Sequence, residues 1–177
     1  MTFFDRIGEE VEPASEDRSV HPADWLMLLG FMALCVGAAF VGGLLTLPGL
    51  GTWYRGLLKP GWTPPYWIFG PVWSALYLVM AVAAWLVWRR RRSVRVVIPL
   101  LLFVEQLILN VAWPGVFFTL RNPALAAGEV LLLWFSIFIT VLAFRNISML
   151  AAGLMEIYLL WVTFAATLTI AIWHLNA

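Results

Sequence analysis

The sequence predicts an all-α integral membrane protein, a bundle of five transmembrane helices with a long lid loop between the first two. Hydrophobic residues make up 63% of the chain and charged residues only 12%, unlike a typical soluble domain. Five apolar stretches are each close to the ~20 residues that cross the hydrocarbon core of a bilayer. Lipid-exposed sheet edges are not tolerated and the short alternating segments of a membrane barrel are absent, so these stretches are expected to be helices.

The expected spans are separated from an acidic N-terminal tail. Residues 1–24 contain seven acidic side chains and few large apolar ones, which predicts a solvated, disordered tail and not a signal peptide. Residues 25–177 form the predicted membrane domain, with spans at about 25–47, 66–88, 97–119, 123–144 and 149–173.

Basic residues indicate the orientation of the bundle. One side of the predicted membrane carries Arg18, Arg89, Arg90, Arg91, Arg92, Arg95 and Arg145, and the other only Arg55, Lys59 and Arg121. The positive-inside rule therefore places the N-terminus in the cytoplasm. The net charge is +1 and the clustered arginines flank a span, so they are interpreted as membrane anchors, and no nucleic-acid partner is expected.

The first loop, residues 48–65, is rich in proline and glycine and holds Trp53, Tyr54 and Trp62. It is apolar enough to fold back over the mouth of the bundle as a lid. The alternative is an interfacial anchor whose aromatic rings lie at headgroup depth.

Counting depth along the spans brings several side chains to one level. At 1.5 Å per residue, Asn110 and Trp161 lie roughly 18 to 20 Å from the cytoplasmic side, and Trp73, Trp113 and Ala165 roughly 22 to 24 Å. If these side chains face inward, they form an aromatic chamber with one amide beneath the lid. Such walls suit a flat, conjugated, hydrophobic small molecule. The simpler alternative is that the tryptophans only fill space between helices.

Three acids lie within the spans, and intramembrane carboxylates suggest function by default. Glu105 and Glu156 have similar depths, so they could share a proton or face one water-filled crevice; Glu129 could pair with Arg121. Structural pairing is the alternative to a proton relay. His21, His174 and Cys35 have no ligand spacing, so no metal site is predicted. The sequence also lacks the residue patterns of hydrolases and kinases.

One long motif resembles a known family. Residues 53–77, WYRGLLKPGWTPPYWIFGPVWSALY, are similar to the TspO/MBR signature WYxxLxKPxWxPPxxxFxxxWxxLY at every fixed position. The third span adds Gln106, Leu109, Asn110, Trp113, Phe117 and Phe118, which resemble QxxLNxxWxxxFF, and the fifth adds Tyr158, Trp161, Ala165 and Leu168, which resemble YxxWxxxAxxL.

The resemblance implies a five-helix protein that binds tetrapyrroles such as protoporphyrin IX in a pocket closed by the first loop, as a sensor, regulator or transporter. It implies no required cofactor, a porphyrin being ligand or substrate, and a homodimer in the lipid bilayer. By motif, the ligand-binding positions are Trp53, Tyr54, Trp62, Phe69, Trp73, Gln106, Asn110, Trp113, Tyr158, Trp161 and Ala165.

Two other functions stay open. Trp73 and Trp161 match tryptophans associated with light-dependent porphyrin breakdown, which would make the protein an enzyme. A small proton-coupled exporter would use Glu105 or Glu156. The chain also departs from the family pattern: Ile157 replaces a proline, Thr169 replaces an asparagine, and Pro114 is shifted by one residue. These departures make the bending of the third and fifth spans uncertain, and the C-terminal sterol motif is missing.

Overall fold

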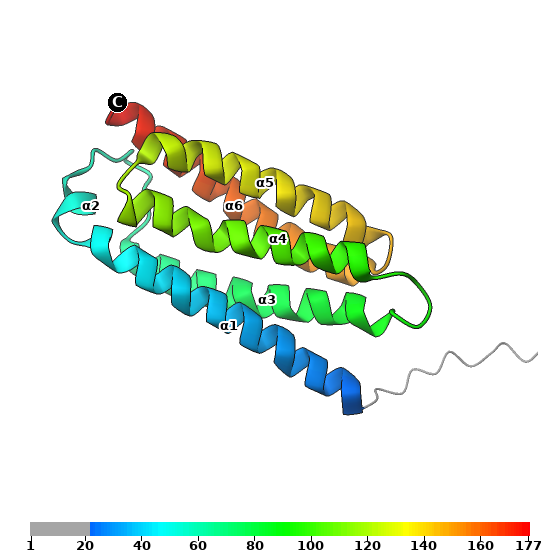
Figure 1. Ribbon diagram of the computed structural model, residues 1–177. Coiled ribbons are helices and arrows are strands. Elements are labelled where there is room, and N and C mark those ends of the chain that lie inside the picture. Colours follow the sequence, from blue (N-terminus) through cyan, green and yellow to red (C-terminus); the bar gives the residue numbers. More distant parts are fainter. Residues whose placement is uncertain (1–21) are drawn as a thin grey trace, which may run out of the picture.

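The computed structural model describes residues 22–177, so the predicted tail at 1–24 falls almost wholly outside the described residues. Within these described residues, five helices are long and apolar enough to cross a membrane, which confirms the five-helix prediction (Figure 1). They are α1 (Pro22–Leu50), α3 (Phe69–Arg89), α4 (Val97–Pro114), α5 (Pro123–Arg145) and α6 (Met149–Leu175). Shorter elements are α2 (Thr52–Gly56), the 3-10 turn η2 (Tyr66–Ile68) and the π-helical turn η3 (Gly115–Thr119).

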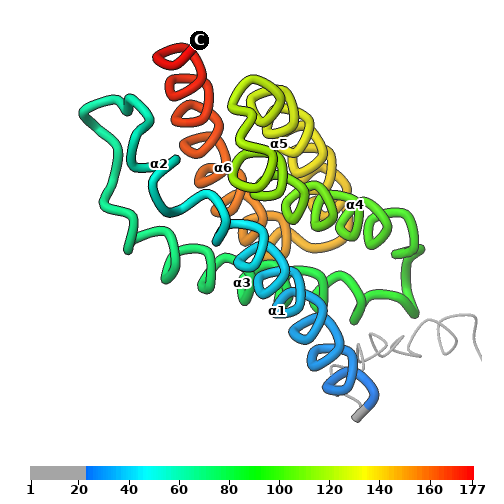
Figure 2. Tube along the Cα trace, turned by 60° about the vertical axis from the view of Figure 1, so that its left-hand side comes forward, coloured from blue at the N-terminus to red at the C-terminus, as the bar shows by residue number. Residues whose placement is uncertain are grey.

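The five long helices pack as a closed ring. Going around it, α1 contacts α3, α3 contacts α6, α6 contacts α5, α5 contacts α4, and α4 returns to α1. Figure 2 shows that the chain between α1 and α3 loops out at the same end of the bundle as the C-terminus. This ring encloses a central space that side chains from several helices can line.

Local chemistry sets the helix ends. The side chain of Asn122 accepts a hydrogen bond from the backbone N–H of Leu125 at 3.0 Å and caps α5, whose first residue is Pro123. Ser148 caps α6 in the same way, at 3.3 Å from the N–H of Ala151. Pro114 ends the regular part of α4 and the π-helical turn follows it, whereas α6 runs unbroken through Ile157. The absent proline therefore leaves α6 continuous.

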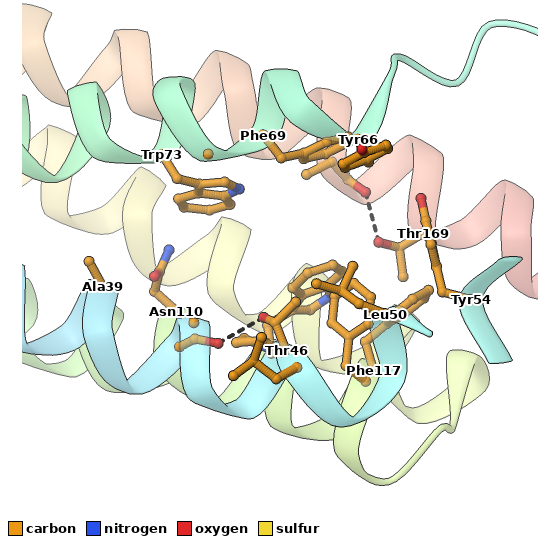
Figure 3. Close-up of a pocket in the computed structure, with 18 of the residues that line it drawn as sticks. Ala39, Thr46, Leu50, Tyr54, Tyr66, Phe69, Trp73, Asn110, Phe117 and Thr169 are labelled. Atoms are coloured by element: carbon orange, nitrogen blue, oxygen red, sulfur yellow. Dashed lines mark hydrogen bonds between the residues drawn. The ribbon is translucent and has the colours of Figure 1, made fainter. Parts of the chain in front are cut away.

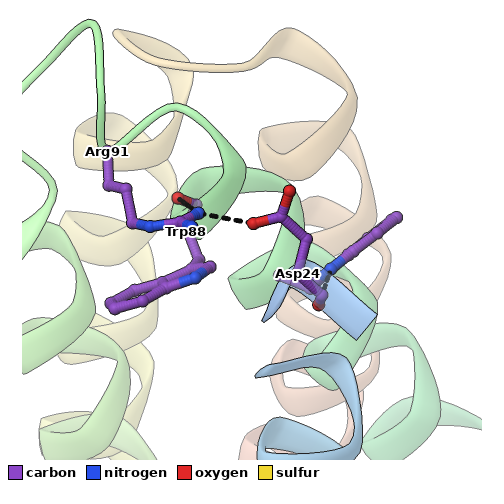
Figure 4. Close-up of polar contacts among 4 residues, drawn as sticks. Asp24, Trp88 and Arg91 are labelled. Carbon is purple, nitrogen blue, oxygen red and sulfur yellow. Dashed lines mark hydrogen bonds and ion pairs between the residues drawn. The ribbon is translucent and has the colours of Figure 1, made fainter. Parts of the chain in front are cut away.

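The arginine-rich end of the bundle is locked by an ion pair. Arg91 Nη1 lies 2.6 Å from Asp24 Oδ1 (Figure 4), and its guanidinium lies 4.7 Å from the Trp88 ring centre. The indole N–H of Trp85 donates to the backbone oxygen of Asp24 at 2.7 Å. Asp24 was assigned to the tail by sequence, but it lies in the first turn of α1, and its side chain is buried. These contacts fix the start of α1 against the end of α3.

The intramembrane acids do not meet as expected. Glu105 on α4 and Glu156 on α6 are both exposed on the outside of the bundle, and α5 packs between their helices. The suggested shared crevice is therefore wrong, because equal depth did not mean the same face. Glu129 is half-buried, and neither carboxylate oxygen has a hydrogen-bond partner. Arg121 instead donates to the backbone oxygen of Pro48 at 3.4 Å.

Candidate ligand-binding cavity

A cavity of about 530 Å³ lies inside the lid end of the ring. This volume falls within the range of small-molecule sites. Figure 3 shows Thr46 and Leu50 of α1 across the cavity from Phe69 and Trp73 of α3. Its lining comes from every long helix except α5: Ala39, Gly42, Gly43, Thr46, Leu47, Leu50, Tyr54, Tyr66, Trp67, Phe69, Gly70, Trp73, Ser74, Tyr77, Asn110, Trp113, Pro114, Phe117, Phe118, Ala165, Leu168, Thr169 and Ile172.

The first loop folds back over this cavity as a lid. The rings of Trp53 and Tyr54 pack on Phe117 of η3, with centroids 5.5 and 6.3 Å away. Farther along the loop, Trp62 packs on Phe164 of α6 at 5.9 Å. These contacts attach the loop to two separate walls of the bundle, so the structure favours the lid over a loop that is only an interfacial anchor.

The end of α6 clamps the same loop. The Asn176 side chain donates to the backbone oxygen of Leu58 at 2.9 Å and accepts from the backbone N–H of Leu58 at 3.0 Å. Its amide nitrogen also lies 2.8 Å from the backbone oxygen of Ile172. The Asn176 side-chain amide thus pairs with both the backbone N–H and the backbone C=O of Leu58, as a backbone amide does between two β-strands. Sequence reasoning did not find this contact, because Leu58 and Asn176 are 118 residues apart.

A hydrogen-bonded amide sits in the deep wall of the cavity. The hydroxyl of Tyr77 donates to Oδ1 of Asn110, and Nδ2 of Asn110 donates to the hydroxyl of Tyr158 at 2.7 Å. All three side chains are buried, and Tyr158 is fully so. A primary amide has two N–H groups and two oxygen lone pairs, so Asn110 keeps one donor and one acceptor beyond these bonds. Asn110 lines the cavity and can therefore offer them to a ligand.

The cavity wall is electrically neutral. No lysine, arginine, histidine or acid is among the lining residues, and the side-chain polar groups are hydroxyls, the indole N–H groups of three tryptophans and one amide. A cation, Lys59 in the lid, lies beside one lining residue, with its Nζ 4.6 Å from the Tyr54 ring centre. Burial raises the pKa of the Tyr54 hydroxyl, which keeps this lining group uncharged. The cavity is thus suited to the apolar body of a ligand, with any ionised group left at the mouth.

The structure brings together six of the eleven residues named from the sequence. Trp73, Asn110, Trp113 and Ala165 share the cavity, as their common depth predicted, and Tyr54 and Phe69 join them from the lid and the start of α3. The other five, Trp53, Trp62, Gln106, Tyr158 and Trp161, do not line it.

Those five residues have supporting positions. Trp53 and Trp62 hold the lid, and Tyr158 lies behind Asn110, as described above. Gln106 is fully buried and donates to the backbone oxygen of Phe103 at 2.9 Å. Trp161 packs behind Phe69, with ring centroids 5.9 Å apart. Of the two tryptophans named for light-dependent chemistry, Trp73 lines the cavity, whereas Trp161 contacts the lining residue Phe69 and does not line the cavity itself.

Sequence reasoning missed the wall contributed by α1. Six residues of this helix line the cavity, and none carries a family motif. The available signal was Gly42–Gly43, a pair of small residues inside an apolar span, which lets other groups approach the helix closely. At Gly42 a Cβ would make only an ordinary contact, 3.6 Å from Cγ of Pro114. Gly49 does require the absence of a side chain, because a Cβ there would lie 2.6 Å from the backbone oxygen of Phe118.

Comparison with known proteins gives a consistent result. The sequence profile of the TspO/MBR family matches residues 31–174. The human translocator protein is 39% identical over 159 residues, which are 86% of this chain and 91% of the relative. A tryptophan-rich protein TspO from Chlorobaculum tepidum is 36% identical over 149 residues, 82% of this chain and 92% of the relative. A tryptophan-rich sensory protein from Cereibacter sphaeroides is 35% identical over 153 residues, 86% of this chain and 93% of the relative.

Proposed function

Because the chain belongs to the TspO/MBR family, we propose that it binds a flat tetrapyrrole such as protoporphyrin IX in the cavity beneath its lid. The protein would act as a sensor, regulator or transporter of that ligand. The observation that carries the proposal is the neutral cavity beneath the lid, which is lined largely by aromatic and aliphatic side chains.

The shape and chemistry of the lining support a flat ligand. The rings of Phe69, Trp73, Trp113 and Phe117 come from three sides of the cavity, and aromatic faces and edges bind conjugated rings well. Ala165 leaves room in the wall opposite, because its side chain is only a methyl group. The free donor and acceptor of Asn110 would fix the orientation of a ring nitrogen or a polar substituent.

Charge supports an amphipathic ligand. A macrocycle with carboxylate side chains would place its apolar ring in the neutral cavity and leave its carboxylates at the lid, near Lys59 and Arg55. Burying those carboxylates among the lining residues would be unfavourable, because their desolvation free energy would not be offset by an ion pair when no cation lines the cavity.

A fluorescence titration tests the proposal. Protoporphyrin IX added to the purified full chain in detergent should quench tryptophan emission saturably at about micromolar concentration or below, which corresponds to roughly 8 kcal/mol. Trp73 and Trp113 in the lining explain why the quenching should be strong. Quenching that never saturates and equals that of free tryptophan would refute a binding site, and free N-acetyltryptophanamide is the matched control.

The orientation and the assembly are further parts of the proposal. The N-terminus and the arginine-rich end of α3 would face the cytoplasm, which puts the lid on the opposite side of the membrane. The chain would form a homodimer in the bilayer. Cysteine labelling at Arg92 and at Gly61 with an impermeant reagent tests the orientation, because both positions are exposed and lie at opposite ends of the bundle.

A further inference from the structure

The cavity has an open side that faces the bilayer between α1 and the start of α3. We propose that the ligand enters sideways from the membrane through this opening, while the lid stays closed. This inference rests on the proposed function, since it assigns an entry route to the same cavity.

The exposure of the lining residues locates the opening. Lining residues of α4, η3 and α6 are all buried or half-buried. On the other side, Leu47 of α1 is 64% exposed, Tyr66 of η2 is 77% exposed and Trp67 is 65% exposed, although all three line the cavity. These side chains contact both the cavity and the surroundings, which places the opening between α1 and η2.

The opening lies within the membrane-spanning part of the chain. Leu47 belongs to the apolar span Ala23–Leu50, and Tyr66 and Trp67 begin the apolar span Tyr66–Arg89. Tyrosine and tryptophan rings are characteristic of the boundary between headgroups and hydrocarbon. A hydrophobic ligand dissolved in the bilayer would therefore meet the opening without crossing water.

Two glycines stand at the edges of the opening. Gly43 on α1 and Gly70 on α3 both line the cavity and are exposed, and a Cβ added at either would meet nothing within 4 Å. A larger side chain at these positions would therefore extend into open space without displacing the packed core. The gap exists at this point because neither helix has a side chain to fill it.

The lid offers a costlier route. Opening it would break both hydrogen bonds between Asn176 and Leu58 and separate Trp62 from Phe164. The sideways route breaks none of these contacts. The lid would instead keep water out while the ligand moves between cavity and lipid.

Stopped-flow kinetics test the route with substitutions of increasing side-chain size at the two glycines beside the opening. The probe is protoporphyrin IX, mixed with the full chain in phosphatidylcholine nanodiscs, and the signal is tryptophan quenching. Gly43→Phe and Gly70→Phe should slow both association and dissociation about tenfold or more while changing Kd less than about threefold, because a plug raises the barrier and not the energy of the bound state. Gly43→Leu and Gly70→Leu should slow both rates less, and they keep the test available if a Phe variant misfolds.

Matched controls lie on the same helices. Gly37→Phe on α1 and Ala75→Phe on α3 add the same ring at exposed positions that do not line the cavity, and they should leave both rates unchanged. Asn176→Ala removes the clamp on the lid and should also leave both rates unchanged.

The possible results distinguish failure of the proposed entry route from failure of the proposed function. Unchanged association in both Gly43→Phe and Gly70→Phe would overturn the sideways route, and so would faster association in Asn176→Ala. Faster dissociation with normal association would show that the new ring fills the cavity and not its opening, which also overturns the assignment. If wild type itself shows no saturable quenching, the proposed function fails instead.

Discussion

The amide in the deep wall should contribute to stability through the two tyrosines it joins. Asn110→Leu preserves a branched side chain of similar size but leaves the hydroxyls of Tyr77 and Tyr158 without their partner. A buried hydroxyl left without a hydrogen-bond partner lowers the free energy of unfolding by about 1–3 kcal/mol, whereas one interhelical hydrogen bond in a membrane contributes about 0.6 kcal/mol on average. Tyr158 is fully buried and should bear most of the loss, while Tyr77 borders the cavity, where water can reach it. We therefore expect a loss of about 2 to 3 kcal/mol.

The assay is unfolding by SDS in mixed micelles, followed by circular dichroism. Adding Tyr158→Phe to Asn110→Leu should restore at least half of the lost free energy of unfolding, because the stranded hydroxyl is removed. Adding Tyr77→Phe should restore less. Ser74→Ala is the control, since Ser74 is exposed and bonds only to Gly70 of its own helix. A free energy of unfolding for Asn110→Leu within about 0.5 kcal/mol of wild type would refute this reasoning.

Three other predictions follow from the cavity and from the ion pair. Ala165→Phe should crowd the cavity and weaken protoporphyrin IX binding at least about tenfold in a folded protein, and unchanged quenching would show that the ligand lies elsewhere. If illumination of the complex gives a product not formed in free solution, Trp73→Phe should remove that product and Trp161→Phe should reduce it less. Chromatography of the pigments measures the amount of product. Equal losses in the two variants would contradict the cavity geometry. Asp24→Ala leaves Arg91 without its ion-pair partner and should lower the free energy of unfolding by about 1–2 kcal/mol, whereas a fully solvated pair would give no change.

The sequence predicted the five spans because length and hydropathy decide them. The observed helices α3, α5 and α6 each lie within two residues of the expected spans 66–88, 123–144 and 149–173, once the short turn at Tyr66 is counted with α3. Counted together with the π-helical turn η3, α4 matches the expected span 97–119. The largest remaining difference is in α1, which extends three residues beyond 25–47 at both ends. Pro48 suggested an earlier end, but a proline near the end of a helix disturbs only the bonds of the preceding turn.

Depth along a span was predictable, but direction around the helix was not. Trp73 and Trp113 had the expected depth and also line the cavity, whereas Trp161 had the expected depth but packs against Phe69 and does not line it. Glu105 failed for the same reason and lies on the outer face of α4. When every face of a helix is apolar, a periodic pattern cannot distinguish the side facing lipid from the side facing the core. Only the family motif could assign those directions, and it covered no residue of α1.

Side-chain size explains why the cavity lies at the lid end of the bundle. At the arginine-rich end, α3 and α6 present the fully or nearly fully buried residues Ala83, Ala84, Ala151 and Ala152, and small residues let transmembrane helices approach closely. At the lid end the lining combines large rings such as Trp73 and Trp113 with small residues such as Gly43 and Ala165, and the space between them is the cavity. The same chain therefore joins a close-packed half, locked by Arg91 and Asp24, to a hollow half. This division lets a ligand enter or leave the hollow half while the packed half preserves the fold, so substitutions in the cavity should affect binding more than assembly.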